Sequence, residues 1–329
     1  MGLILSILLG FIPMFCFAGC VYWLDRYEKE PAALLGGVFG WGAIVAAGAA
    51  YLINTVIGTG VYLFTNSEAV TELTTGSLVA PIVEESLKGL AVLAVYLVFL
   101  NEFDSLLDGM IYAAITALGF AATENSYYIY NLGFHEGNYP GLFAMAFIRV
   151  VLVGWQHPFY TAFTGIGLAI SRLNKNLPIK ILAPIAGWSV AVLTHAFHNT
   201  LAHLLNGVEG LLFSTAVDWL GWLVVFCVLI MAIRSERRTL TIYLREEVQL
   251  GTITANQYQT ACSQGAQWLA RTGSLFAGRY RTTNRFYQLA AELAHKKNQL
   301  NYLGEERGNS QRISNLRNEL AGLSPLADS

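Results

Sequence analysis

Three ionisable residues, Glu84, Glu85 and Lys88, lie within five positions of a segment that is otherwise apolar from Leu78 to Leu100. A charged side chain at bilayer depth costs a few kcal/mol on insertion scales. Such residues therefore require one another, a metal ion or a water-filled cavity. Glu84 and Lys88 are four positions apart on one helical face, which predicts an ion pair between them. Glu85 would then be the carboxylate without a partner in its own helix. A purely structural ion-pair network is the alternative.

Further residues with acid–base or ligand chemistry lie in other apolar segments. They are Glu124 with Asn125, His157 in Gly154–Pro158, and His195 with Asn199. Imidazoles with a carboxylate or amide can hold a catalytic metal ion, and a spare carboxylate can take a proton from water. His195 and Asn199 are four positions apart, so both can reach one metal ion from one helix. The alternative for each histidine is a hydrogen-bonded core residue.

Two single charges, Arg149 and Asp218, also lie in apolar segments and are expected to pair or to snorkel. Serine chemistry has no support, because the chain contains no GxSxG motif. HExxH is also absent, so a metalloprotease here would not be a zincin. Four scattered cysteines form no CxxC pair, which argues against a thiolate metal site.

The composition is that of a polytopic membrane protein, with 54% hydrophobic and 13% charged residues. A soluble protein has roughly 25% charged residues. The predicted fold is an all-α membrane bundle of about seven spans, because long apolar blocks predict helices and nothing alternates as in a membrane barrel. The predicted spans are 2–24, 36–64, 78–100, 107–130, 143–171, 181–205 and 211–233.

Basic residues in the short loops predict the orientation. The first loop, the fifth loop and the segment after the last span carry Arg26, Lys29, Arg172, Lys175, Lys180, Arg234, Arg237 and Arg238. The loops at 65–76, 131–141 and 206–210 carry no Lys or Arg. The positive-inside rule therefore predicts an N-terminus outside and a C-terminus in the cytoplasm.

The composition becomes more polar and more basic from about residue 235. We therefore expect a transmembrane catalytic domain at 1–234 and a small cytoplasmic helical tail at 235–329. Helices are predicted at 253–271, which starts at the cap candidate Thr254, and at 283–304, which repeats apolar residues at helical spacing. The last fifteen or so residues are expected to be frayed.

Four ordered motifs together resemble the PrsW-type intramembrane protease family, which is related to the CAAX prenyl protease and bacteriocin-processing superfamily. The motifs are EExxK at 84–88, FxxxEN at 120–125, HxxxTxxxG at 157–165 and HxxxN at 195–199. The first loop, with Asp25 and Glu30-Pro31, is similar to an Asp…Glu-Pro loop of the family. The likeness extends from about residue 20 to 205 and leaves out the seventh span and the tail.

The resemblance implies an endopeptidase that hydrolyses a peptide bond of a membrane-anchored protein, as in site-1 cleavage of an anti-sigma factor. Glu84 would activate the water, with Glu85 and Lys88 in support. Zinc or another divalent metal would be held by residues among Glu124, His157, His195 and Asn199. In the prenyl-protease branch the second motif carries a histidine in place of Glu124, so a metal-independent glutamic mechanism stays open.

The resemblance also implies a bacterial or archaeal plasma membrane as the location, with a protein substrate and the lipid bilayer as partners. Nucleic acid is not expected as a partner. Two other functions remain open on the residues alone. A transporter or scaffold could relay protons through the intramembrane Glu and His residues. A seven-span lipid hydrolase would require a third histidine at the metal, such as His198 or His203.

Overall fold

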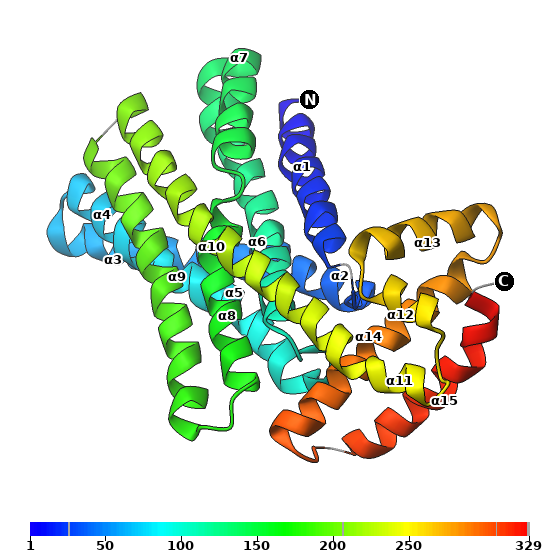
Figure 1. The fold of residues 1–329 in the computed structure, drawn as a ribbon. Helices are drawn as coiled ribbons and strands as arrows, with labels where there is room; N and C mark the ends of the chain where they lie inside the picture. The colour runs from blue at the N-terminus through cyan, green and yellow to red at the C-terminus, as the bar shows by residue number, and fades with distance from the viewer. Residues whose placement is uncertain (26, 206, 307, 328–329) are drawn as a thin grey trace. The chain divides into compact units, whose positions relative to one another are not determined.

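In the computed structural model, residues 1–25, 27–205, 207–306 and 308–327 are described, and all their regular structure is helical (Figure 1). The predicted all-α fold class is therefore confirmed. Arg26, on which part of the orientation argument depends, lies outside the described residues.

The first ten α-helices are α1 (Gly2–Leu24), α2 (Ala32–Gly40), α3 (Ala47–Thr65), α4 (Glu68–Thr74), α5 (Ala80–Val98), α6 (Leu106–Tyr128), α7 (His135–Ala146), α8 (Gln156–Arg172), α9 (Leu177–Leu205) and α10 (Gly207–Tyr243). They are followed by α11 (Arg245–Gln249), α12 (Ala255–Ala261), α13 (Gln264–Phe276), α14 (Tyr280–Leu303) and α15 (Asn309–Ala327). Short π-helical stretches occupy Trp41–Ala46, Thr75–Val79, Ile129–Phe134 and Phe147–Leu152, and a 3₁₀ turn occupies Leu100–Glu102.

Five helical stretches of the described residues are long and apolar enough to cross a membrane. They are Gly2–Leu24, Ala32–Thr65, Leu106–Arg172, Leu177–Leu205 and Gly207–Gln249. The third is 67 residues long and includes two predicted spans, 107–130 and 143–171. The predicted span at 78–100 corresponds to α5, which is more polar because it carries two glutamates and a lysine.

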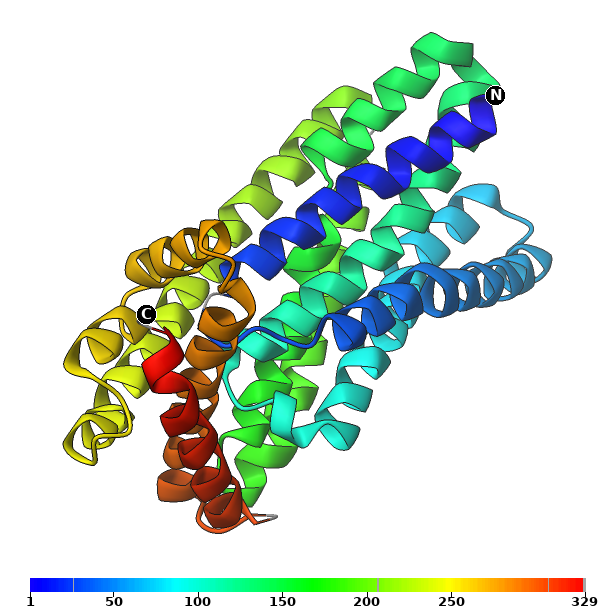
Figure 2. The same cartoon turned by 90° about the vertical axis from the view of Figure 1, so that its right-hand side faces the viewer.

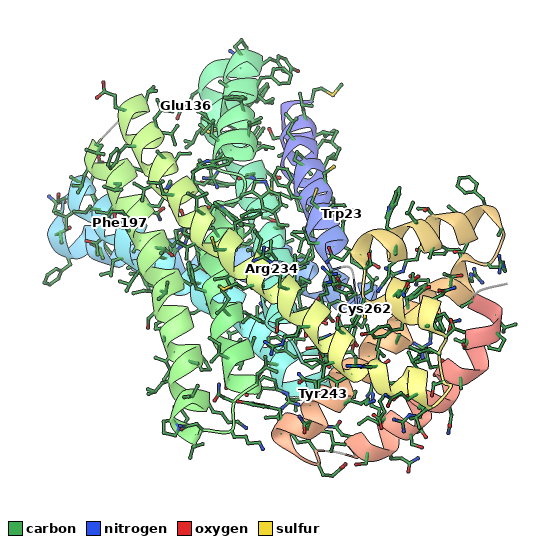
Figure 3. The ribbon with its side chains drawn as sticks, viewed as in Figure 1. Trp23, Glu136, Phe197, Arg234, Tyr243 and Cys262 are labelled. Atoms are coloured by element: carbon green, nitrogen blue, oxygen red, sulfur yellow. The ribbon has the colours of Figure 1, made fainter. Side chains whose placement is uncertain are left out.

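Large apolar side chains lie on the outside of these helices, as expected for a protein that is solvated by lipid. Trp23 at the end of α1 and Phe197 on α9 are 55% and 52% exposed (Figure 3). An apolar exterior on long apolar helices makes this chain an integral membrane helix bundle.

The chain forms two compact units. The first comprises Met1–Trp23 with Glu30–Val228, and the second comprises Leu24–Lys29 with Leu229–Ser329. The assignment of catalysis to residues 1–234 and of a cytoplasmic location to 235–329 stays a prediction.

In the first unit, α8 packs against α5, α6 and α9, and α5 also packs against α6 and α9 (Figures 1 and 2). The start of α6 is defined by a capping box, in which Ser105 caps the helix and Asp108 accepts a hydrogen bond from the Ser105 backbone. Gly109 of α6 and Gly165 of α8 permit a close approach, because a Cβ on Gly165 would lie 2.0 Å from the Gly109 carbonyl oxygen. This close contact accounts for Gly165, the glycine at the end of the HxxxTxxxG motif.

The predicted span at 143–171 is interrupted in its middle. The π-helical stretch Phe147–Leu152 ends, Val153–Trp155 form turns, and α8 begins at Gln156. Pro158 therefore lies in the first turn of a helix, where its missing N–H would have no intrahelical partner. The break places His157 beside the first residue of α8.

The second unit has a helical core of its own. Thr254 caps a helix, α12, as predicted, and it does so in a capping box with Gln257. The predicted helix at 253–271 is divided between α12 and α13. The expectation of a frayed end was wrong for residues 315–327, because α15 continues to Ala327 and buries Leu316 and Leu320 in this core; residues 328–329 lie outside the described residues. Apolar residues at helical spacing hold that end in place.

Candidate functional site

Seven residues singled out in the sequence come from four neighbouring helices. Glu84, Glu85 and Lys88 lie on α5, Glu124 on α6, His157 on α8, and His195 and Asn199 on α9. Glu84, Glu85, Lys88, His157 and His195 are all buried. The pairwise packing of these helices explains how positions more than a hundred residues apart in sequence become neighbours.

The predicted ion pair of Lys88 with Glu84 is present within α5, but Lys88 has a second partner that was not predicted, Glu85. Lys88 Nζ lies 2.5 Å from Glu85 Oε1 and 3.9 Å from Glu84 Oε2, so Glu85 is the closer partner. Both i,i+3 and i,i+4 spacings bring side chains together on a helix. Contacts from α8 and α9 decide between them: Thr161 Oγ1 donates to Glu85 Oε2 at 2.8 Å, and His195 Nδ1 donates to Glu85 Oε1 at 3.0 Å. Glu85, and not Glu84, is therefore the fully bonded carboxylate.

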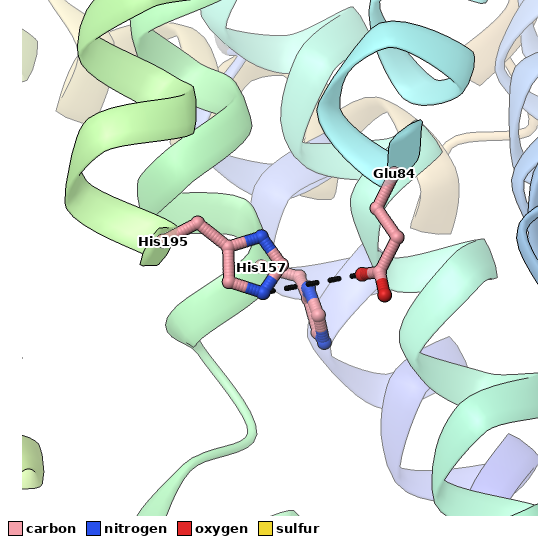
Figure 4. A group of neighbouring side chains, drawn as sticks. All are labelled: Glu84, His157 and His195. Carbon is pink, nitrogen blue, oxygen red and sulfur yellow. Dashed lines mark ion pairs between the residues drawn. The ribbon is translucent and has the colours of Figure 1, made fainter. Parts of the chain in front are cut away.

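Glu84, His157 and His195 face a common point (Figure 4). One ligand atom from each lies within 4.8 Å of the others. Among the described residues, Glu84 Oε2 is buried and has no hydrogen-bond partner. It lies 3.9 Å from His195 Nε2, a separation too long for a direct hydrogen bond.

The hydrogen bond to Glu85 determines which nitrogen of His195 is available. A carboxylate can only accept, so Nδ1 carries the proton in the neutral ring and Nε2 presents a lone pair. That lone pair faces the unpartnered oxygen of Glu84. Two acceptors that face each other in a buried site require a hydrogen-bond donor or a cation between them.

His157 is held from two sides. Lys88 Nζ donates to Nδ1 at 3.1 Å, since an ammonium group has no acceptor, and Nε2 then donates to Glu124 Oε2 at 2.7 Å. Phe120 contacts both His157 and Lys88. The centroid of its ring lies 5.1 Å from that of the His157 ring and 4.4 Å from Lys88 Nζ. The phenylalanine of the FxxxEN motif thus packs against this polar pair.

Arg149 supplies the partner that Glu124 and Asn125 require. Its guanidinium forms an ion pair with Glu124, and Nε donates to Asn125 Oδ1 at 2.9 Å. The site then contains three carboxylates (Glu84, Glu85 and Glu124) and two cations (Lys88 and Arg149), so ionised carboxylates exceed the cations by one. A buried excess charge is costly, and a divalent cation or a proton would balance it.

Asn199 is not part of the group that faces the common point. Its Nδ2 donates to the backbone oxygen of Gly76 at 2.8 Å, in the π-helical stretch that precedes α5. It lines the same cavity as Glu84, His157 and His195. The group whose ligand atoms all lie within 4.8 Å of one another thus consists of Glu84 and the two histidines, whereas Glu124 and Asn199 were expected as ligands and Glu84 was not.

Two hollows meet at the glutamates. A cavity of about 320 Å³ is lined by Glu84, Glu124, His157, His195 and Asn199 among others. A more apolar groove of about 450 Å³ between α3 and α6 also reaches Glu84 and Glu124. Unpartnered Asn54 Oδ1 and Thr75 Oγ1 belong to residues that line this groove, counting only partners among the described residues.

The residues present fit a divalent metal. Two imidazoles are suitable donors for such an ion, and beside them lies a carboxylate oxygen without a hydrogen-bond partner among the described residues, in reach of a water molecule at the ion. Glu85 stands behind His195 as the carboxylate that commonly orients a ligating histidine. His157 would have to exchange one of its two present partners for the metal.

Comparisons with known proteins agree with these features. A family model described as PrsW family intramembrane metalloprotease matches residues 30–233. The match begins later than the expected likeness at 20–205, so it leaves out Asp25 of the first loop. It includes the whole predicted seventh span at 211–233, which was expected to lie outside the likeness. Protease PrsW of Clostridioides difficile (strain 630) is 36% identical over 115 residues, which are 34% of this chain and 46% of that protein. The aligned segment thus spans less than half of that relative. No solved structure matches the chain significantly.

Proposed function

The chain belongs to the PrsW family of intramembrane metalloproteases, and on that premise we propose that it hydrolyses a peptide bond of a membrane-anchored protein. Glu84 is the base that activates the attacking water. The observation that carries this proposal is Glu84 Oε2, which has no hydrogen-bond partner among the described residues and faces the lone pair of His195 Nε2 across 3.9 Å. A water molecule placed between them would donate to both.

The proton movements follow from the same contacts. Glu84 takes a proton from the water while the oxygen of the water attacks the carbonyl carbon of the scissile bond. The carbon–nitrogen bond then breaks, and Glu84 returns the proton to the leaving nitrogen to give an amine and a carboxylic acid. The acid proton finally passes to the amine, so that the products are an ammonium group and a carboxylate. Glu85 keeps the ring of His195 in one tautomer during both steps. Lys88 balances the charge of Glu85 and holds Nδ1 of His157.

His157 and His195 are the candidates to hold a zinc or other divalent ion, with Glu84 adjacent. When bound, such an ion would polarise the water and the scissile carbonyl. Metal-independent hydrolysis is the second candidate mechanism. Lys88 favours it, because its ammonium group already lies 3.1 Å from His157 Nδ1 and supplies positive charge inside the site.

The substrate class is inferred from the groove between α3 and α6. Its lining is largely apolar and it reaches Glu84, which suits a membrane-embedded or membrane-adjacent segment with apolar side chains. Site-1 cleavage of an anti-sigma factor is the type of event that the family resemblance suggests. Location in a bacterial or archaeal plasma membrane, with the N-terminus outside and the C-terminus in the cytoplasm, completes the proposal.

New protein N-termini provide the test. Cells that lack the gene are complemented with the wild-type chain, with Glu84→Gln or with Glu72→Gln, and their membranes are compared. Glu72→Gln is the control, because it alters an exposed glutamate on α4. Free N-termini are labelled and identified by mass spectrometry. N-termini that appear with the wild type and with Glu72→Gln, but not with Glu84→Gln, would support the proposal. Identical sets of termini in all strains would refute it.

A further inference from the structure

A buried carboxylate on α10, Asp218, lies outside the group of residues that the proposed mechanism uses. Asp218 is only 4% exposed, although α10 is one of the most apolar helices of the chain. A carboxylate in such a position is costly unless it is paired and hydrogen-bonded. The identity of its partners therefore indicates what the chain gains from keeping it.

Three donors converge on one oxygen of this carboxylate. Gln156 Nε2 lies 2.6 Å from Asp218 Oδ2, Tyr160 Oη donates to it at 2.9 Å, and His198 Nδ1 lies 2.7 Å from it. Gln156 and Tyr160 belong to α8, and His198 belongs to α9. Asp218 thus connects the seventh predicted span to both helices that carry the site histidines.

Two of these three contacts, those of Tyr160 and Gln156, come from residues next to a histidine of the site. The Tyr160 ring stacks on the His195 ring, with centroids 4.7 Å apart and planes 14° apart. Gln156 directly precedes His157 and is the first residue of α8, after the break at Val153–Trp155. The hydrogen bonds to Asp218 therefore fix the ring that covers His195 and the helical turn that carries His157.

We propose that Asp218 is a positioning residue, which holds His195 through Tyr160 and holds His157 through Gln156. His195 is then fixed from two directions, by the Glu85 hydrogen bond at Nδ1 and by the Tyr160 stack on its face. The consequence for catalysis rests on the proposed function. The placement of the ring does not, and it can be measured without substrate or metal.

A simple packing role would not require this arrangement. A carboxylate that only joined α10 to its neighbours could use donors anywhere along their length. The donors used instead are Gln156, Tyr160 and His198, and all three line the cavity that contains Glu84 and both site histidines. Outer partners of this kind typically change ligand affinity or activity about tenfold to a hundredfold when they are removed.

The experiment uses the full-length protein in lipid, labelled with ¹⁵N in its histidine side chains. The ring-nitrogen signals of His195 are assigned by their loss in His195→Ala. They are compared in the wild type, in Asp218→Asn, in Tyr160→Phe, which keeps the ring but removes the hydroxyl donor, and in Ser214→Ala. Ser214 is buried one turn earlier on α10 and bonds only to its own helix among the interactions described, so it is a matched control.

We expect one set of His195 signals in the wild type and in Ser214→Ala. In Asp218→Asn the signals should shift or split, and Tyr160→Phe should show a smaller change in the same direction. Production of new N-termini should fall about tenfold to a hundredfold in Asp218→Asn. Wild-type His195 signals in both Asp218→Asn and Tyr160→Phe would overturn the positioning role. If the His195 signals change in these variants but the wild-type protein itself produces no new N-termini, the positioning role is supported and the proposed function is refuted.

Discussion

Two buried glutamates, one in each unit, have closely similar surroundings. Glu247 of the second unit is bonded at Oε1 by Lys297 at 2.8 Å and by Arg317 at 2.7 Å, and at Oε2 by Arg317 at 2.8 Å. Glu85 of the first unit is bonded at Oε1 by Lys88 and His195 and at Oε2 by Thr161. Both carboxylates therefore have partners at both oxygens.

The difference lies next to them. Beside Glu85 stands Glu84, whose buried Oε2 has no hydrogen-bond partner among the described residues and whose side chain lines a cavity with two histidines. Glu246 beside Glu247 is directed to Lys297 and is largely exposed. A satisfied buried carboxylate is a structural feature in either unit. An unsatisfied one that faces imidazoles across a cavity can carry out chemistry.

The largest stability effect is expected at Glu85. Glu85→Ala leaves Lys88 buried without its closest partner, which should destabilise the protein by about 3–5 kcal/mol. Glu84→Gln removes no hydrogen bond that the structure contains and should change stability by less than about 1 kcal/mol. Denaturant unfolding of both variants in the same detergent measures the difference. Equal destabilisation by both would break the distinction between the two glutamates.

Metal binding should separate the histidines from Asn199. His195→Ala removes a candidate ligand and should weaken zinc binding at least about a hundredfold, or about 2.7 kcal/mol. Asn199→Ala should leave zinc binding nearly unchanged, because its amide bonds to the Gly76 backbone. Equilibrium dialysis of the purified protein against zinc provides both values. Wild-type zinc affinity in His195→Ala would contradict the ligand assignment.

Loss of Glu247 should have a smaller effect on stability, limited to the second unit. Glu247→Gln cannot satisfy both Lys297 and Arg317, but these cations are partly exposed and regain water. We expect a cost of about 1–3 kcal/mol. Amide exchange in α11, α14 and α15 should accelerate while the helices around Glu84 keep their protection. Unchanged exchange in those three helices would show that the cluster does not hold the second unit together.

The smallest expected effect is a dependence on pH in the second unit. Burial alone would raise the pKa of the Glu247 carboxyl, but hydrogen bonds from Arg317 and Lys297 outweigh it and lower the pKa below its usual value. The stabilisation is therefore fully present above the unfolded pKa of about 4.3 and is lost as the pH falls through the lowered pKa. Exchange rates in α14 should rise over this acidic range in the wild type and much less in Glu247→Gln.

The sequence was sufficient to predict the helical class and the helices that carry the candidate polar residues. Intramembrane charges are expensive, so their positions are informative without a structure. Helical spacing alone could not predict that Lys88 pairs with Glu85, because i+3 and i+4 partners are nearly equivalent within one helix. Contacts from Thr161 and His195 on other helices decide that pairing.

The role of α10 was also beyond the sequence. Asp218 was recognised only as a single intramembrane charge, and its three donors come from positions 156, 160 and 198. No periodic pattern relates residues so distant along the chain. Asn199 shows the opposite case, because its spacing from His195 is right for a shared metal, yet its amide bonds to the backbone of Gly76.

The most direct test of the central claim is the cleavage activity of Glu84→Gln measured together with its metal content. The account predicts a folded protein that produces new N-termini about 10²- to 10⁴-fold more slowly than the wild type. It also predicts that the variant binds as much zinc as the wild type, because Glu84 acts as the base and the histidines hold the ion. Wild-type cleavage by Glu84→Gln would contradict the account, and loss of zinc from this variant would make Glu84 a ligand instead of the base.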